Sequence, residues 1–241
     1  VGLRALAAQA DRIAVVGGGY IGSELAAALV QQGVDTVLVH STATLGADVF
    51  PADLADHFAG MFRDAGVELV GGHEVVGGVA GDAGVRLDLE GGATVVADAV
   101  VSGLGIEVQT ELAESSGIAT GDGIVVDAHL RTDRADVFAA GDVAEYPDRI
   151  LGRRRVEHVD NAEQMGRQAG RNLAGAGEEY THTPYYYSVV FGTRYEAVGT
   201  LDGSLETVED WVEPLERGVV YYLDDDRVVG VDDLQGCLLY T

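Results

Sequence analysis

The sequence predicts an α/β fold built on a mainly parallel sheet. A short apolar run rich in β-branched residues at 13–16 is typical of a strand covered on both faces. A glycine-rich turn and a helix-forming segment follow it, and a second strand pattern comes next at 36–39. Strand and helix patterns that alternate in this way favour a parallel sheet. With 241 residues the chain can hold one large or two modest domains.

The turn between these strands carries the pattern G-x-G-x-x-G at Gly17, Gly19 and Gly22. The glycines permit a tight turn, close approach of the backbone to a pyrophosphate, and close packing of helix on strand. Unpaired N–H groups at the helix N-terminus attract the same anion. Gly33 then ends the helix. Because the pattern stands between a strand and a helix, it predicts a dinucleotide site.

The next elements follow from local pattern. Residues 1–11 read as a lead-in helix, and residues 51–65 have the apolar spacing of a helix with one buried face. From 67 to 99, alternating apolar residues broken by Gly-Gly and Gly-Asp predict a meander of short strands. Residues 97–105 return to a buried-strand pattern, which ends in glycines that include Gly105.

Asp142 is the most informative residue of the next stretch. Residues 137–140 are strand-like, and Gly141 and Asp142 follow at the carboxyl end of that predicted strand, where ligands of open α/β sheets bind. A carboxylate in that position accepts hydrogen bonds from sugar-like hydroxyl groups. It equally serves as the N-cap of the following segment. The residues alone leave both interpretations open.

The C-terminal half begins with a basic triplet at 153–155, which could meet a phosphate or an acidic partner. In so acidic a protein, internal ion pairs are the expected role. A helix is predicted from Asp160 to about Gly175. Beyond Thr183, alternating apolar runs predict antiparallel strands, with an acidic hairpin tip at 224–226 that lacks the spacing of a calcium loop.

The charge balance is extreme: 40 acidic residues stand against 15 basic ones, all of them arginine, for a net charge of −25. Such a surface repels nucleic acid and anionic lipid. Acidic excess accompanied by 47% hydrophobic residues and clear periodicity indicates a folded protein with an acidic coat. We hypothesise adaptation to molar salt, because screening then acts over only about 3 Å.

Several classes of protein are not supported. No apolar run reaches the roughly 18 residues of a membrane helix, so no membrane span and a cytoplasmic location are expected. The single cysteine, Cys237, leaves no internal disulfide and is expected to be a buried structural thiol. No histidine falls in a metal-ligand spacing and there is no nucleophile elbow, which argues against hydrolases and metalloenzymes.

Four stretches taken in order carry a family resemblance: VVGGGYIGSELAAAL, TDRADVFAAGDVAEYP, LGRRRVEHVDNAEQMGRQAGRNLAG and PYYYSVVFGTRYEAVG. Together they resemble the FAD/NAD(P)-dependent pyridine nucleotide-disulfide oxidoreductases, in particular the ferredoxin reductase and apoptosis-inducing-factor-like branch. The resemblance implies a Rossmann-like NAD(P)-binding domain at 1–116, the second segment of an FAD-binding domain at 117–178, and a small α+β interface or dimerisation domain at 179–241.

One departure from that family concerns FAD. The family holds the FAD pyrophosphate on an earlier G-x-G-x-x-G segment, and this sequence contains only the second such motif. We therefore expect the chain, which also begins with valine, to be a fragment without the N-terminal FAD-binding segment.

The resemblance also implies roles for the residues around the glycines. Gly17, Gly19 and Gly22, with Ile21 in the same turn, would hold the NAD(P)H pyrophosphate. Tyr20 would act as a movable gate beside the flavin, or else pack helix against sheet. Glu24 would accept a hydrogen bond from the nicotinamide carboxamide, although an acid there also complements the helix dipole.

In the second half of the chain, the resemblance assigns the flavin contacts. Asp142, after Gly141, would bind the ribityl chain of FAD. Glu157 and His158 precede a helix that would point at the N1 and O2 edge of the flavin, where its dipole favours negative charge on the reduced ring. Tyr187 would cover the isoalloxazine or nicotinamide ring, with core packing as the alternative.

The choice of dinucleotide stays open. The end of the second strand usually carries an acid that binds the adenosine ribose, or has nearby arginines for a 2′-phosphate. Here it carries His40, followed by Ser41 and Thr42. Neither rule applies, and both NADH and NADPH remain candidates.

The implied reaction is hydride transfer from NAD(P)H to FAD, followed by electron delivery to an acceptor: a ferredoxin or rubredoxin-like protein, a quinone, a disulfide or oxygen. A homodimer is compatible with the family. The alternative, from another class, is a nucleotide-binding fragment or an NAD(H)-responsive interaction protein like the apoptosis-inducing factors, without significant turnover.

Overall fold

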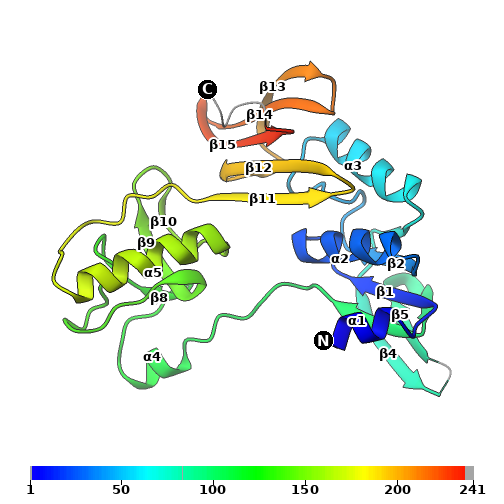
Figure 1. Cartoon of the computed structure of the whole chain (residues 1–241), viewed down its shortest axis with the longest axis horizontal. Helices are drawn as coiled ribbons and strands as arrows, with labels where there is room; N and C mark the ends of the chain where they lie inside the picture. Colours follow the sequence, from blue (N-terminus) through cyan, green and yellow to red (C-terminus); the bar gives the residue numbers. More distant parts are fainter. Residues whose placement is uncertain (1, 83, 237–241) are drawn as a thin grey trace.

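A computed structural model describes residues 2–82 and 84–236 and confirms the mixed α/β fold. Figure 1 shows three regions: a parallel sheet with its helices, a small segment built around a long helix, and a C-terminal antiparallel sheet that lies over both. The strands of the described residues form four sheets, ordered β3-β2-β1-β7, β4-β5-β6, β10-β9-β8 and β11-β12-β15-β14-β13.

The parallel sheet consists of β1 (Arg12–Val16), β2 (Asp35–His40), β3 (Glu68–Gly71) and β7 (Ala99–Ser102). The prediction for β3 was wrong, because this strand joins the parallel sheet and not the meander. Arg12 explains part of that pairing: its guanidinium lies 2.8 Å from Asp35 and 2.6 Å from Glu68, at the first residues of β2 and β3. The prediction of a buried strand for β7 was also too strong, since its residues are half-buried or exposed.

Helices and a second sheet cover this sheet. The helices are α1 (Gly2–Ala7), α2 (Tyr20–Gln31) and α3 (Ala52–Asp64). The predicted meander is confirmed for β4 (Val75–Gly81), β5 (Gly84–Leu89) and β6 (Thr94–Ala97), with the 3-10 turn η1 (Glu90–Gly92) between the last two. Apolar side chains of β5 and β6 pack on those of β1 and β2, so the meander closes one face of the parallel sheet.

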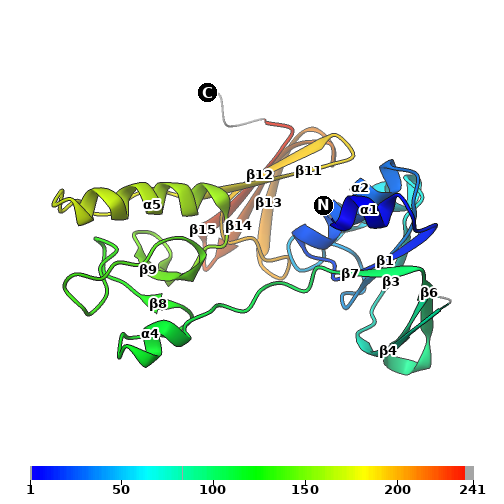
Figure 2. The ribbon, with the colours of Figure 1, turned by 60° about the horizontal axis from the view of Figure 1, so that its bottom comes forward.

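An extended linker at 103–110, without regular structure, leads to the next segment (Figure 2). That segment contains α4 (Glu111–Ser115), β8 (Ile124–Val125), the 3-10 turn η2 (Gly141–Val143), β9 (Ala144–Asp148), β10 (Gly152–Arg154) and α5 (Val159–Leu173). The strand predicted at 137–140 is absent from this described segment. Only an isolated bridge between Arg131 and Phe138 forms there, because the chain turns into η2 before a strand can extend.

The predicted internal ion pairs of the basic triplet are confirmed. Arg155 lies 2.6 Å from Glu157 and 3.4 Å from Asp122, and Arg153 lies 3.9 Å from Glu145. These arginines fasten β10 to the loops around it, so their charge is largely neutralised within the segment.

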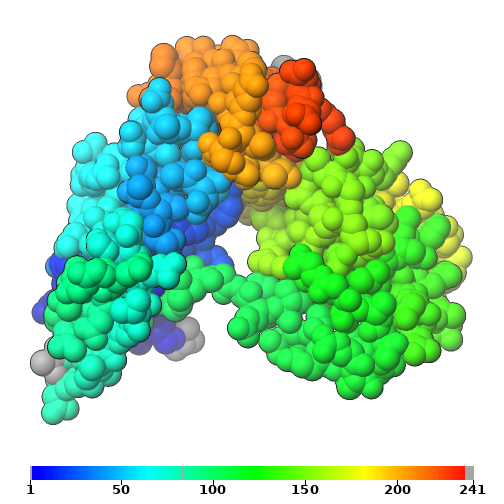
Figure 3. Space-filling view, turned by 180° about the vertical axis from the view of Figure 1, so that it is seen from behind, coloured from blue at the N-terminus to red at the C-terminus, as the bar shows by residue number. Residues whose placement is uncertain are grey.

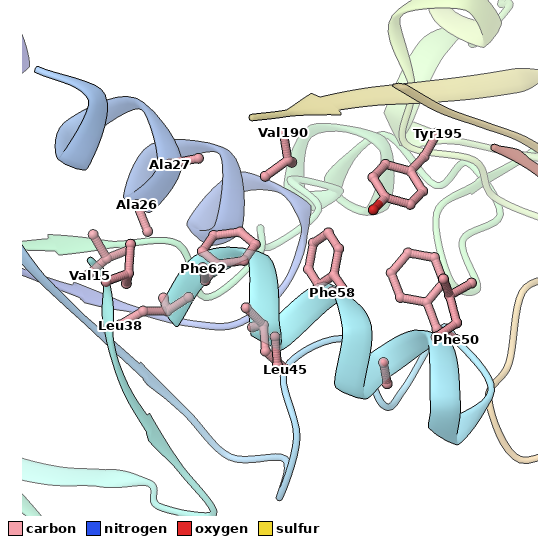
Figure 4. Close-up of a cluster of buried hydrophobic side chains, with 14 of the residues drawn as sticks. Val15, Ala26, Ala27, Leu38, Leu45, Phe50, Phe58, Phe62, Val190 and Tyr195 are labelled. Atoms are coloured by element: carbon pink, nitrogen blue, oxygen red, sulfur yellow. The ribbon is translucent and has the colours of Figure 1, made fainter. Parts of the chain in front are cut away.

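The C-terminal antiparallel sheet agrees with the prediction: β11 (Tyr185–Val190), β12 (Thr193–Gly199), β13 (Glu206–Glu213), β14 (Arg217–Asp224) and β15 (Arg227–Leu234). One face packs on α2 and α3, where Phe50, Phe58 and Phe62 meet Tyr195 and Val190 (Figure 4). The expectation for Cys237 falls outside the described residues. Within residues 2–82 and 84–236, no helix has both the length and the apolar composition to cross a membrane.

Candidate functional site

The glycine turn between β1 and α2 is closed by glycines in contact with one another. Gly17 adopts φ +113°, and a Cβ at Gly22 would lie 1.8 Å from the carbonyl oxygen of Gly17. Both positions therefore require glycine. Gly103, at the end of β7, packs on the same turn, since a Cβ there would lie 3.0 Å from the backbone of Gly22. Sequence reasoning missed Gly103, although its place two residues before Gly105 was a usable signal.

Gly19 differs from the other two glycines of the motif. It is the N-cap of α2, and a Cβ built at this position would have nothing within 4 Å. No side-chain hydrogen bond caps this end of the twelve-residue helix. The first-turn N–H groups of α2 thus have no side-chain cap, and an uncapped helix N-terminus is the arrangement that binds a phosphate.

One cleft of about 640 Å³ brings together predicted residues from all three regions of the chain. Figure 3 shows the molecule hollowed between residues 1–100, coloured blue to teal, and the green segment at 117–178. The predicted residues that line the cleft are Tyr20, Ile21, Glu24, Asp142, Glu157, His158 and Tyr187. Arg154 and Arg155, which belong to the basic triplet, also line the cleft, as does Tyr186, which the sequence analysis did not single out.

Aromatic rings form one wall of this cleft. Tyr20 and Tyr186 meet edge to face with ring centroids 5.9 Å apart, and the ring of His158 lies 5.9 Å from that of Tyr187. Tyr20 is 45% exposed and Tyr187 is 47% exposed, so neither is a core residue. Tyr186 was missed because three consecutive tyrosines on a strand alternate in direction, and the sequence does not show which of them faces α2.

The Glu24 carboxylate is held by a hydrogen bond from another region of the chain. The Oγ of Ser188, on β11, donates to Oε1 of Glu24 at 2.7 Å. Ser188 is buried, whereas Glu24 is exposed to the cleft. The carboxylate is thereby fixed in direction while its second oxygen stays available as an acceptor.

The N-terminus of helix α5 lies at the same cleft. His158 is its N-cap, and its Nδ1 accepts a hydrogen bond from the backbone N–H of Asp160 at 3.2 Å. Burial lowers the pKa of His158, so the ring is a neutral acceptor at neutral pH. The positive end of a fifteen-residue helix therefore faces the cleft beside Glu157.

Asp142 lines the cleft and also a second, mainly apolar cavity of about 820 Å³. This second cavity is lined by the linker, α4 and Phe138, among others. Asp142 does not occupy an N-cap position at this turn, because it lies inside η2, whose N-cap is Ala140. Within the described residues, Asp142 thus connects two cavities that together could hold an elongated ligand.

Besides the glycines of the turn, three further predicted residues do not line the cleft. His40 is 4% exposed, and a Cβ at Gly18 or Gly71 would come within 2.7 Å of it, so its ring packs behind the glycine turn. Burial also lowers the pKa of His40. Gly105 stands in the linker with open space around it, and Gly141 adopts φ +78° beside α5. The described residues contain no cluster of three or more side chains suited to a metal ion.

Comparison with known proteins agrees with this geometry. The model of the pyridine nucleotide-disulphide oxidoreductases matches residues 2–166. The chain belongs to that family.

Three relatives illustrate the similarity. Monodehydroascorbate reductase from Pisum sativum is 32% identical over 228 residues, which cover 90% of this chain and 52% of the relative. The 5,5'-dehydrodivanillate O-demethylase ferredoxin reductase subunit of a Sphingobium strain is 33% identical, with 93% and 55% covered. The crystal structure of a ferredoxin reductase from Rhodopseudomonas palustris superposes with a TM-score of 0.88 at 25% identity, with 97% and 58% covered.

The chain spans about half the length of these relatives. The activity of a whole protein of this kind is therefore argued below from the site.

Proposed function

We propose that this chain is the NAD(P)H-handling part of a flavoprotein oxidoreductase that passes electrons from NAD(P)H through FAD to an acceptor. The observation that carries the proposal is the single cleft in which Tyr20 and Glu24 of α2 face Asp142 and the start of α5. A nicotinamide and a flavin must stack with reacting atoms about 3 to 3.5 Å apart, so a reductase needs such a shared cleft.

For the dinucleotide, the fit is direct. The open surface at Gly19, the free N–H groups of α2 and the close-packed glycines suit a pyrophosphate. Glu24, held by Ser188, would accept a hydrogen bond from a carboxamide N–H. Tyr20 is exposed enough to move as a ring enters the cleft. We assign this role to residues 1–116.

For FAD, the described residues fit one half of the molecule. Asp142 has carboxylate oxygens available for ribityl hydroxyl groups, and the positive end of α5 suits the electron-rich edge of the reduced ring. Tyr187 offers a ring face, although Arg194 already lies 5.5 Å over it. No second glycine turn is present for the ADP half. We assign these contacts to residues 117–178 and 179–241, the latter as an interface domain that could also pair two copies.

When bound, the nicotinamide supplies a hydride and the flavin accepts it. The side chains of this chain place the two rings, keep water out and stabilise charge, and none is required as a nucleophile. Because His40 is neutral and buried behind the turn, it neither binds a ribose as an acid would nor repels a 2′-phosphate. We therefore propose NADH or NADPH as donor.

The relatives suggest two kinds of acceptor: a ferredoxin, as the name of the Sphingobium subunit indicates, and monodehydroascorbate, as the name of the pea enzyme indicates. A net charge of −25 argues against nucleic acid as a partner. We propose adaptation to molar salt on the same charge argument.

The dinucleotide site is tested by fluorescence titration of the chain with NADH and with NADPH. Gly19→Ala places a methyl group in the open space at the helix N-terminus without a clash inside the protein, so it should fold normally and bind the dinucleotide at least about tenfold more weakly. Gly60→Ala, in α3, also meets nothing within 4 Å and serves as the matched control.

Equal affinity of Gly19→Ala and the wild type for the dinucleotide would contradict the proposed dinucleotide site at the start of α2. The flavin half is tested by titrating FAD and by anaerobic reduction with the dinucleotide that binds. Binding of NADH without any flavin reduction would favour the nucleotide-binding module over the reductase.

A further inference from the structure

Asp232, on β15, is a carboxyl group buried inside the C-terminal sheet. It is 1% exposed, and neither of its carboxylate oxygens has a hydrogen-bond partner. Burying a charged carboxylate without a hydrogen-bond partner costs folding free energy, and the cost is smaller when the group is protonated and neutral. It lies opposite Ala197 of β12, which in turn lies opposite Tyr186 of β11. Directly opposed residues point to the same face of a sheet, so Asp232 shares a face with Tyr186.

That face is turned toward the wall of the cleft. Tyr186 lines the cleft and meets the ring of Tyr20 edge to face. Burial is the main cause that raises the pKa of Tyr20, Tyr186, Tyr195 and Tyr222, and the charge of Asp232 raises the pKa of each hydroxyl further. The hydroxyl of Tyr222 is buried and also lacks a partner. Two unsatisfied groups, one carboxyl and one hydroxyl, thus lie in a single cluster of tyrosines behind the cleft.

The charges around this cluster favour a neutral Asp232. Burial, and after it the negative charge of Asp233 on the same strand, raise the pKa of Asp232 to about 8. Of the other charged groups, Glu209 acts on Tyr222 and Arg154 acts on Tyr186. A carboxyl group that keeps its proton places no negative charge behind the cleft.

We propose that Asp232 acts as a neutral acid behind the wall of the dinucleotide cleft. In that state no negative charge lies behind Tyr20 and Tyr186. If Asp232 loses the proton, a carboxylate faces the same wall and repels the anionic dinucleotide. This inference rests on the proposed function of the cleft.

Proton binding and dinucleotide binding are then linked, and the link is reciprocal. A bound dinucleotide raises the proton affinity of Asp232, so binding near pH 8 takes up protons. Conversely, a rise in pH through the pKa of Asp232 should weaken binding, by about threefold to tenfold between pH 7 and pH 9.

Isothermal titration calorimetry with NADH, in two buffers of different ionisation enthalpy at pH 8, measures the proton uptake. We expect uptake of up to ~0.5 proton per dinucleotide in the wild type, since the group is about half protonated there. Asp232→Asn is neutral at every pH and should bind without uptake and with affinity that does not change from pH 7 to pH 9. Asp210→Asn removes an exposed charge of the same sheet and should behave as the wild type.

Equal proton uptake in the wild type and in Asp232→Asn would overturn the proposal. Infrared spectroscopy of the wild-type protein without a ligand provides a second test. The free protein should show the C=O band of a protonated carboxyl group at pH 6.5, and the band should disappear by pH 10. Absence of that band would overturn the proposal that Asp232 is neutral. Failure to bind NADH at any pH would instead contradict the proposed function, and the band would still decide the state of Asp232.

Discussion

The core under the glycine turn and the core of the segment at 117–178 differ in how completely they are closed. Around α3, Phe58 and Phe62 are buried against rings that come from the distant C-terminal sheet (Figure 4). In the segment, a smaller cluster around Leu130, Tyr146 and Met165 is buried. Its outer side is open, with the apolar cavity of about 820 Å³ and with Leu112 82% exposed.

This difference separates what holds the fold together from what serves the ligand. The dinucleotide-binding turn rests on a closed core shared by two regions, so its geometry is fixed before any ligand arrives. The segment that we assign to FAD exposes apolar surface around Asp142, and a bound ligand would remove that surface from water. We therefore expect substitutions in the two regions to have very different costs.

The largest effect is expected for Phe62→Ala. Phe62 is fully buried and packs on Phe58 and Phe191, so its loss leaves a cavity and should destabilise the protein by about 3 to 5 kcal/mol. Leu112→Ala, in the open face, should change stability by less than about 0.5 kcal/mol. Urea unfolding of both variants measures the contrast. Similar costs for the two substitutions would mean that the open face is covered in solution.

The closed region was also the more predictable of the two. The pattern of Gly17, Gly19 and Gly22 is local, and a short strand, a turn and a helix can be recognised from neighbouring residues alone. The helix start at His158 was equally visible. In both places the geometry depends on residues close in sequence.

Long-range pairing explains the errors. Glu68 begins a parallel strand, and Arg12, far away in sequence, marks that pairing with an ion pair. The strand-like pattern at 137–140 has no strand beside it to pair with among the described residues. Pattern does not reveal side-chain direction: the ring of His40 packs behind the glycine turn, outside the cleft, and its assignment to the cofactor site stays a prediction. Tyr186 was missed for the same reason.

A smaller effect is expected where the two regions meet the dinucleotide. Ser188→Ala removes the hydrogen bond to Glu24 without opening a large cavity. This bond is present in the free protein, and a hydrogen bond to a charged group contributes about 1.5 to 3 kcal/mol, so the unfolding free energy should fall by up to that amount. NADH should also bind about tenfold more weakly, because the Glu24 carboxylate is no longer held in direction. Fluorescence titration measures the affinity. Ser204→Ala, in an exposed turn, is the control, and equal affinities for both variants would remove Glu24 from the site.

Salt should act on both regions alike, with the smallest effect. The net charge of −25 is spread over the surface, and each neighbouring pair of exposed like charges costs only tenths of a kcal/mol, so molar KCl should raise the unfolding free energy by about 1 kcal/mol. Urea unfolding at low and molar KCl measures the gain, and hydrogen exchange shows where it falls. Slower exchange in both β1 and α5 would fit relief of surface repulsion. Slower exchange in α5 alone would show that salt acts on the open apolar face, and no gain at all would end the hypothesis of salt adaptation.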